Sequence, residues 1–164
     1  MNKRLAGWLF LACVVVVLDQ GTKYLITQWL SFGQRVPVTP FFDLVLVYNP
    51  GAAFSFLADH SGWQRWLFIV LTSSVSVWLL LLLRRHASEC LLPLGLALIL
   101  GGAVGNLIDR VLLGAVVDFL YFHAGNHGFP AFNVADSAIT AGVVLMLADQ
   151  FGLAARGARA EKEA

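Results

Sequence analysis

The sequence predicts a membrane protein built from four transmembrane helices and a small loop region that contains β-structure. Three observations lead to this fold class. Of the 164 residues, 59% are hydrophobic and only 13% are charged, whereas soluble domains carry about a quarter charged residues. The mean hydropathy is +0.76. Four apolar segments each approach the roughly 20 residues that a helix needs to cross the hydrocarbon core.

The four segments set the expected domain organisation. Lys3 and Arg4 precede an apolar run as in a signal peptide, but no small-residue cleavage site follows, so this run is expected to stay as the first helix. The length suits one domain, so we expect residues 1–164 to form a single integral membrane unit. Its spans are predicted at about 5–26, 66–83, 91–108 and 134–153, and its long loops at 27–65 and 109–133.

Basic residues predict the orientation of these spans. If all four are real, one side of the membrane holds Lys3, Arg4, Arg84, Arg85, Arg156, Arg159 and Lys162. The other side holds Arg35 and Arg65, with Arg110 at its boundary. By the positive-inside rule both termini are then cytoplasmic, and the two long loops face outward.

The first outer loop is expected to be structured. Residues 42–48 alternate apolar side chains around Asp43, as in a short strand. Asn49-Pro50-Gly51 then forms a strong turn signal.

Acidic and basic residues within or beside the spans are the main functional candidates, because charges are costly in lipid. They are Asp19, Lys23, Asp109, Arg110, Asp118, Asp136 and Asp149. In the predicted topology all but Asp149 lie near the outer face, so they share one depth.

Asp118 and Asp136 suit acid–base chemistry. Asp118 follows the third span and Asp136 begins the fourth, with a connection short enough to bring the two together. In peptide hydrolysis one carboxylate can take a proton from water while the other, protonated, donates to the carbonyl oxygen. The alternative is that Asp136 caps its helix and Asp118 is a solvated loop acid.

Other polar residues favour structural roles. Asp19 and Lys23 are four residues apart in the order that favours a helix ion pair, and a structural pair is preferred to direct catalysis. Gly101 and Gly105 permit close helix contact. Asn106 and Arg110 share a helix face, and a buried Asn in a span usually bonds to another helix.

Several other chemistries fit poorly. His123 and His127 have ligand-like spacing but lack an HExxH or CxxC context, so we expect no metal. The sequence contains no phosphate-binding loop and no GxSxG elbow, and we expect no cofactor. The net charge of +1 gives no basic field for a nucleic acid. Cys13 and Cys90 are interpreted as inert thiols.

Five blocks of the chain, in order, resemble the lipoprotein signal peptidase (signal peptidase II) family. They are Asp19-Gln20-Gly21-Thr22-Lys23, Asn49-Pro50-Gly51-Ala52-Ala53-Phe54-Ser55, residues 101–110 (GGAVGNLIDR), Val116-Val117-Asp118-Phe119 and Phe132-Asn133-Val134-Ala135-Asp136-Ser137. The resemblance covers nearly the whole chain.

The resemblance implies an aspartic endopeptidase with Asp118 and Asp136 as its catalytic dyad. The supporting residues that it implies are Asp19, Lys23, Asn49, Gly51, Asn106, Arg110, Asn133 and Ala135. Its substrate would be a diacylglyceryl-modified prolipoprotein, cleaved just before the lipidated cysteine. The enzyme would lie in the bacterial inner membrane, with its site at the periplasmic face. It would contact membrane lipid, bind the cyclic peptide globomycin and act as a monomer.

Two alternatives come from other functional classes. A small transporter or proton-relay protein could use the same acids, although transporters place their sites near the midplane between inverted repeats, and no repeat is evident here. A non-catalytic membrane subunit could use the acids only for helix assembly.

Overall fold

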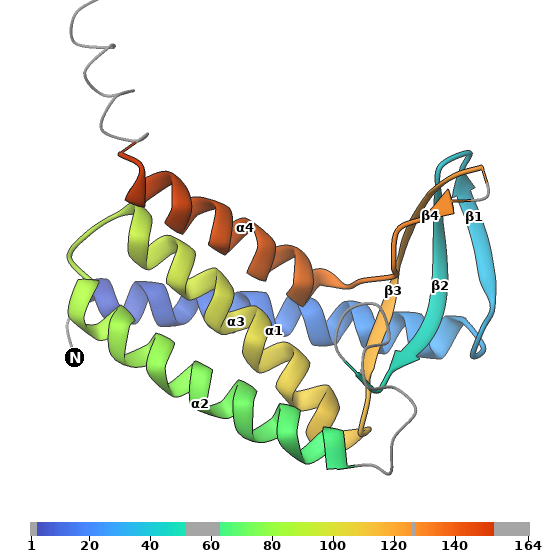
Figure 1. Ribbon diagram of the computed structural model, residues 1–164, viewed down its shortest axis with the longest axis horizontal. Coiled ribbons are helices and arrows are strands. Elements are labelled where there is room, and N and C mark those ends of the chain that lie inside the picture. The colour runs from blue at the N-terminus through green and yellow to red at the C-terminus, as the bar shows by residue number, and fades with distance from the viewer. Residues whose placement is uncertain (1–2, 52–62, 126, 153–164) are drawn as a thin grey trace, which may run out of the picture.

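The structure, a computed structural model, describes residues 3–51, 63–125 and 127–152. Four helices form a bundle and a small sheet lies at one end of it (Figure 1). The helices are α1 (Lys3–Trp29), α2 (Trp63–His86), α3 (Leu91–Leu112) and α4 (Val134–Gln150). The strands are β1 (Arg35–Thr39), β2 (Phe42–Asn49), β3 (Val116–Ala124) and β4 (His127–Gly128).

Three of the described helices, α1, α2 and α3, are long and apolar enough to cross a membrane. Helix α4 has 17 described residues, which corresponds to about 25 Å. The end of its predicted span, at residue 153, lies outside the described residues. The fold is therefore a mostly helical membrane-type fold with three candidate spans and a small antiparallel sheet.

Helix α3 is the central helix and packs against the other three. The glycines of α3 permit this packing because the neighbouring helices come so close that no side chain would fit at these positions. A Cβ at Gly101 would lie 2.7 Å from the carbonyl oxygen of Ala12 in α1, and one at Gly105 would lie 2.6 Å from Asp19. A Cβ at Gly102 would meet the backbone of Ala135 in α4. The predicted close helix contact is thus present.

Within the part of the chain that the structure describes, large apolar side chains on the outer helix faces are exposed, which suits a lipid environment. Phe10, Val17, Val70 and Trp78 are each more than half exposed. In water such a surface would be strongly unfavourable. The interior of the bundle is formed by Ala12, Leu79, Leu83, Leu96 and Leu100.

The sheet has the order β1-β2-β3-β4 with antiparallel neighbours. The strand predicted at 42–48 is confirmed as β2. Strand β3 was not predicted: Asp118 lies in this strand, opposite Val47 of β2, and not in a loop. The run of β-branched and aromatic residues around Asp118 suits a strand, but β3 needs its partner β2 to form.

A second apolar cluster fixes the sheet to the bundle. It joins Ile26 and Leu30 at the end of α1 to Leu46, Val117 and Phe119 of the sheet. As a result, β3 and Asp118 have a fixed position relative to the helices.

Candidate active site

The site lies where the sheet meets α3 and α4. Asp118 is on β3, and the chain returns from β4 to run beside it before α4 begins. Phe132 N donates to the Leu120 carbonyl (3.0 Å), and Leu120 N donates to the Phe132 carbonyl (2.8 Å). This pairing brings the first turn of α4, with Asp136, next to Asp118.

Asn133 joins the two acids. It is fully buried, and it is the N-cap residue of α4 in a capping box with Asp136. Its Nδ2 donates to Asp118 Oδ1 at 2.7 Å, and its backbone N donates to Asp136 Oδ2 at 3.2 Å. The alternative interpretation is therefore right in part: Asp136 takes part in capping α4 as the third residue of the box, but the N-cap residue itself is Asn133.

Asp118 is not a solvated loop acid, because only 3% of it is exposed. Its Oδ2 accepts from Asn49 Nδ2 at 3.1 Å. Burial, and next the charge of Asp136, raise the pKa of Asp118 to about 7, against the hydrogen bonds from Asn49 and Asn133, which lower it. This carboxyl can therefore carry a proton near neutral pH.

Each of the three amides around the acids has its oxygen occupied by a donor. Asn49 Oδ1 accepts from Gly51 N (3.1 Å), which confirms the predicted turn. Asn133 Oδ1 accepts from Asp136 N (2.9 Å). Asn106 Oδ1 accepts from Lys23 Nζ (3.0 Å). The three NH₂ groups must consequently face the other way, and Asn106 Nδ2 donates to Asp136 Oδ1 at 2.8 Å.

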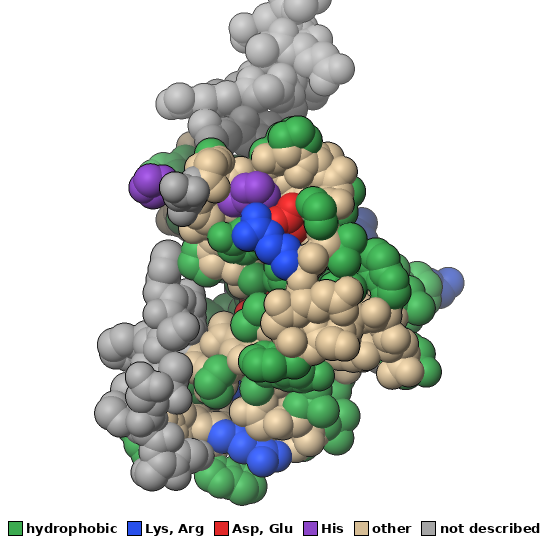
Figure 2. All heavy atoms as spheres, turned by 90° about the vertical axis from the view of Figure 1, so that its right-hand side faces the viewer, with side chains coloured by type: hydrophobic (Ala, Val, Ile, Leu, Met, Phe, Trp, Pro, Cys, Tyr) green, Lys and Arg blue, Asp and Glu red, His purple; other side chains and the backbone are tan. Residues whose placement is uncertain are grey.

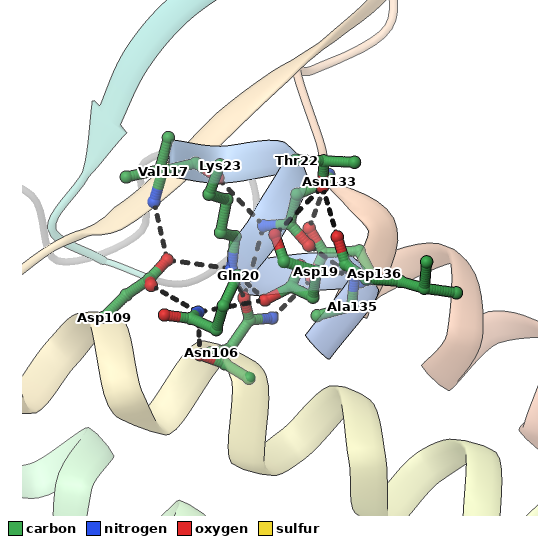
Figure 3. A network of polar contacts seen from close by, with 12 residues as sticks. Asp19, Gln20, Thr22, Lys23, Asn106, Asp109, Val117, Asn133, Ala135 and Asp136 are labelled. Atoms are coloured by element: carbon green, nitrogen blue, oxygen red, sulfur yellow. Dashed lines mark hydrogen bonds and ion pairs between the residues drawn. The ribbon is translucent and has the colours of Figure 1, made fainter. Parts of the chain in front are cut away.

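Behind these amides lies a buried ionic network, shown in Figure 3. Lys23 Nζ is 2.7 Å from Asp19 Oδ2 and 2.8 Å from Asp109 Oδ2. The predicted pair of Asp19 and Lys23 is thus extended by a second carboxylate. Asp19 Oδ1 also accepts from Ala135 N (2.9 Å), and Asp109 Oδ2 accepts from Val117 N (3.1 Å).

A cavity of about 660 Å³ opens beside the two acids. Asp118, Asp136, Asn106 and Arg110 contribute polar groups to a lining that is otherwise largely apolar and includes Phe129, Pro130, Phe132, Ile139 and Ala141. A mostly apolar cavity with a few convergent polar groups is typical of a ligand site. Arg110 also reaches the carbonyl of Gly51, with Nη2 at 3.4 Å.

The comparisons with known proteins agree on one family. The family model described as signal peptidase (SPase) II matches residues 11–152. The chain belongs to the signal peptidase II family. Members are aspartic peptidases that remove lipoprotein signal peptides, and this chain is accordingly a membrane-embedded peptidase of that family. The assignment favours the peptidase over the transporter and the non-catalytic subunit.

Individual relatives cover most of the chain. The lipoprotein signal peptidase of Azoarcus sp. (strain BH72) is 62% identical over 140 residues, covering 85% of this chain and 80% of that protein. The one of Burkholderia vietnamiensis (strain G4 / LMG 22486) is 53% identical, covering 89% and 88%. Two solved bacterial membrane enzymes align with TM-scores of 0.80 and 0.73. Their identities are 34% and 32%, and they cover 89% and 88% of this chain, or 88% and 92% of their own.

All ten residues predicted for the signal peptidase II site come together in space. Six line the cavity: Asn49, Gly51, Asn106, Arg110, Asp118 and Asp136. The other four, Asp19, Lys23, Asn133 and Ala135, form the network behind them. Their individual roles in catalysis or substrate binding stay predictions.

Two members of the network were absent from the predicted site. The sequence predicts Asp109 only as an ionisable candidate, although it lies three residues after Asn106 and therefore on the same face of α3. Gln20 is not among the predicted site residues; its Nε2 donates to Asp109 Oδ1 (2.9 Å), the Gly105 carbonyl (3.1 Å) and Asp19 Oδ2 (3.2 Å). Its position three residues before Lys23 was the available signal.

The two histidines lie away from this site. His123 Nε2 is 3.2 Å from Asp43 Oδ2, and His127 is exposed on β4. Within the residues that the structure describes, no three His, Cys, Asp or Glu side chains come together in a group that could hold a metal ion.

Lys23→Met should destabilise the protein more than Gln20→Met, an unbranched substitution one helical turn away. Losing Lys23 leaves two buried carboxylates without a counter-charge, which costs about 3–5 kcal/mol. Losing Gln20 removes hydrogen bonds from a neutral amide to the two carboxylates, worth about 1.5–3 kcal/mol, but leaves Lys23 in place as their counter-charge. Thermal unfolding and folded yield in detergent measure the difference. Equal stability of the two variants would contradict the central role given to Lys23.

Proposed function

We propose that Asp118 and Asp136 are the catalytic dyad of this signal peptidase II, and that it cleaves diacylglyceryl-modified prolipoproteins just before the lipidated cysteine. The observation that carries the proposal is the bridge by Asn133, which donates one N–H to each carboxylate. Both acids also line the 660 Å³ cavity. Two acids held side by side in a water-accessible cavity suit the hydrolysis of a peptide bond.

The surroundings of the two acids support different tasks. Asp136 lies in the first turn of α4, where the free N–H groups and the helix dipole stabilise a negative charge. It is therefore the base that takes a proton from the attacking water. Asp118, with a pKa of about 7, donates its proton to the carbonyl oxygen. When the tetrahedral intermediate collapses, Asp136 passes its proton to the leaving amine and Asp118 recovers its own.

The position of the cavity suits a lipidated substrate. Its wall includes Ile139 and Ala141 on α4, so the dyad is continuous with an apolar helix face. A diacylated cysteine keeps its acyl chains in the outer leaflet and its peptide at the headgroup level. The same cavity is the expected site for globomycin, and the chain is expected to act as a monomer within the lipid.

The arrangement of basic residues supports four spans with both termini in the cytoplasm of a bacterial inner membrane. The start of α1 and the ends of α2 and α4 lie at the end of the bundle opposite the sheet (Figure 1). That end carries Lys3, Arg84 and Arg85, while Arg35 lies in the sheet. In this proposal α4 is the fourth span, residues 1–164 form one peptidase domain, and the site faces the periplasm.

Reporter fusions test this topology. Reporters after Arg85 and Arg156 should report the cytoplasm, and reporters inserted near residues 60 and 125 should report the periplasm. The reason is the excess of basic residues at the end opposite the sheet. A cytoplasmic signal near residue 125, or a periplasmic signal after Arg156, would contradict four crossings in this orientation.

Asp118→Asn and Asp136→Asn should each lower turnover on the order of a thousandfold or more, because an amide cannot exchange the required proton. The double variant should be little worse, since the two residues act as a unit. Asp149→Asn, on the same helix as Asp136 but remote from the cavity, is the matched control. The measurement is cleavage of a diacylated prolipoprotein by purified protein. A folded single variant with a tenth of wild-type turnover would refute the dyad.

The pH profile should fall on its alkaline side near pH 7. Asp118 acts as an acid, so its contribution is present below its pKa of about 7 and is lost as the pH rises through that value. Asn49→Ala removes a hydrogen bond that lowers this pKa, so the alkaline limb should move to higher pH. The test is kcat/KM against pH for both proteins. A limb that moves to lower pH in Asn49→Ala would show that Asp118 is not the acid.

A further inference from the structure

A second cavity, of about 340 Å³, adjoins the active site on the side of the sheet. Four residues line both cavities: Asn49, Asp118, Pro130 and Ala131. Asp118 is therefore reached from two directions. The larger cavity continues along α4, whereas the second continues over β1 and β2 to Gly33, Arg35 and Val45.

The second cavity contains a charged group, the guanidinium of Arg35, whose position is fixed by contacts with the sheet. Arg35 pairs with Asp43, which is almost completely buried. The Arg35 guanidinium also lies 4.8 Å from the ring centre of Tyr121. The side chain of Arg35 is still 49% exposed, so it can meet a ligand.

The surroundings of the pair favour the ionised form of Asp43. Burial opposes ionisation of Asp43, but hydrogen bonds and charge interactions with Arg35 and His123 outweigh it, so the pKa of Asp43 is lowered. Figure 2 shows basic, acidic and histidine side chains gathered at one place on the sheet end of the molecule. Arg35 is the outermost charge of the pair, since Asp43 is hidden beneath it.

We propose that this second cavity binds the residues that follow the lipidated cysteine in the mature polypeptide, and that Arg35 favours acidic over basic residues there. The inference rests on the proposed function. A substrate whose scissile bond lies at the dyad extends away from it in two directions, and two cavities meet at Asp118. The cavity along the apolar face of α4 suits the signal peptide and the acyl chains.

The cavity over the sheet suits the mature chain for two reasons. It leads away from the helical bundle, and a polar polypeptide must leave in a direction that avoids lipid. Its lining includes the rings of Tyr48 and Tyr121 and the charge of Arg35, which can contact a peptide backbone and acidic side chains. Because an extended residue spans about 3.3–3.6 Å, only the first few residues after the cysteine are expected to contact it.

The test uses diacylated substrates that carry either Asp or Lys at the second to fourth positions after the cleaved bond. The wild type should have a KM lower for the Asp substrate by about two- to fivefold, as expected for a half-exposed ion pair. Arg35→Gln should remove this ratio and Arg35→Lys should keep part of it. Arg85→Gln, at the opposite end of the bundle, is the control and should leave the ratio unchanged.

A second variant covers the case in which Arg35→Gln does not fold. Val47→Trp narrows the second cavity, which Val47 lines, and leaves both Arg35 and Asp43 in the chain. It should raise KM for a substrate with a mature chain more than for one that ends at the lipidated cysteine. Equal KM values for the Asp and Lys substrates in the wild type, or an equal effect of Val47→Trp on long and short substrates, would overturn the inference. Failure of the wild type to cleave any of them would instead overturn the proposed function.

Discussion

The ammonium group of Lys23 is the interaction on which the arrangement of the site depends. It lies between Asp19 and Asp109 and donates to Asn106, and its side chain is only 4% exposed. Asp19 in turn binds the backbone of α4, and Asp109 binds the backbone of β3. One buried cation therefore connects all the elements that carry catalytic candidates. Because an unpaired charge is very costly in this environment, none of these contacts can be lost cheaply.

The same cation also determines how the amide of Asn106 is oriented. An ammonium group has only donors, so Asn106 must turn its oxygen toward Lys23 and its NH₂ group toward Asp136. Asn133 and Asn49 are oriented in the same way by backbone N–H groups. Donors are thus fixed toward both carboxylates before any substrate arrives. Donors fixed in this way are preorganised and need no rearrangement when the reaction begins.

Much of the fold and of the site could be predicted from the sequence. The features that could not be predicted all depend on contacts between distant segments of the chain. Long apolar runs predict helices because each depends only on its own composition, and residues 42–48 alternate clearly enough to predict β2. Strand β3 depends on pairing with β2 and with Phe132, which no local pattern encodes. Asp118 was for that reason expected in a loop. The role of Gln20 could not be predicted because its three acceptors lie on α1 and α3. The second cavity could not be predicted because it is formed by segments that are distant in the sequence.

The use of a strand for one acid and a helix for the other follows from the chemistry proposed for them. An acid that must keep its proton near pH 7 needs burial and a neighbouring negative charge, and Asp118 has both, because it is buried on β3 and lies beside Asp136. An acid that must stay ionised benefits from a helix N-terminus, and the first turn of α4 provides that for Asp136. Asn133 is the last residue before α4, and its hydrogen bonds to both carboxylates keep Asp118 and Asp136 next to each other. The junction between sheet and bundle is thus the place in this fold where two carboxylates can lie together and still differ in their affinity for a proton.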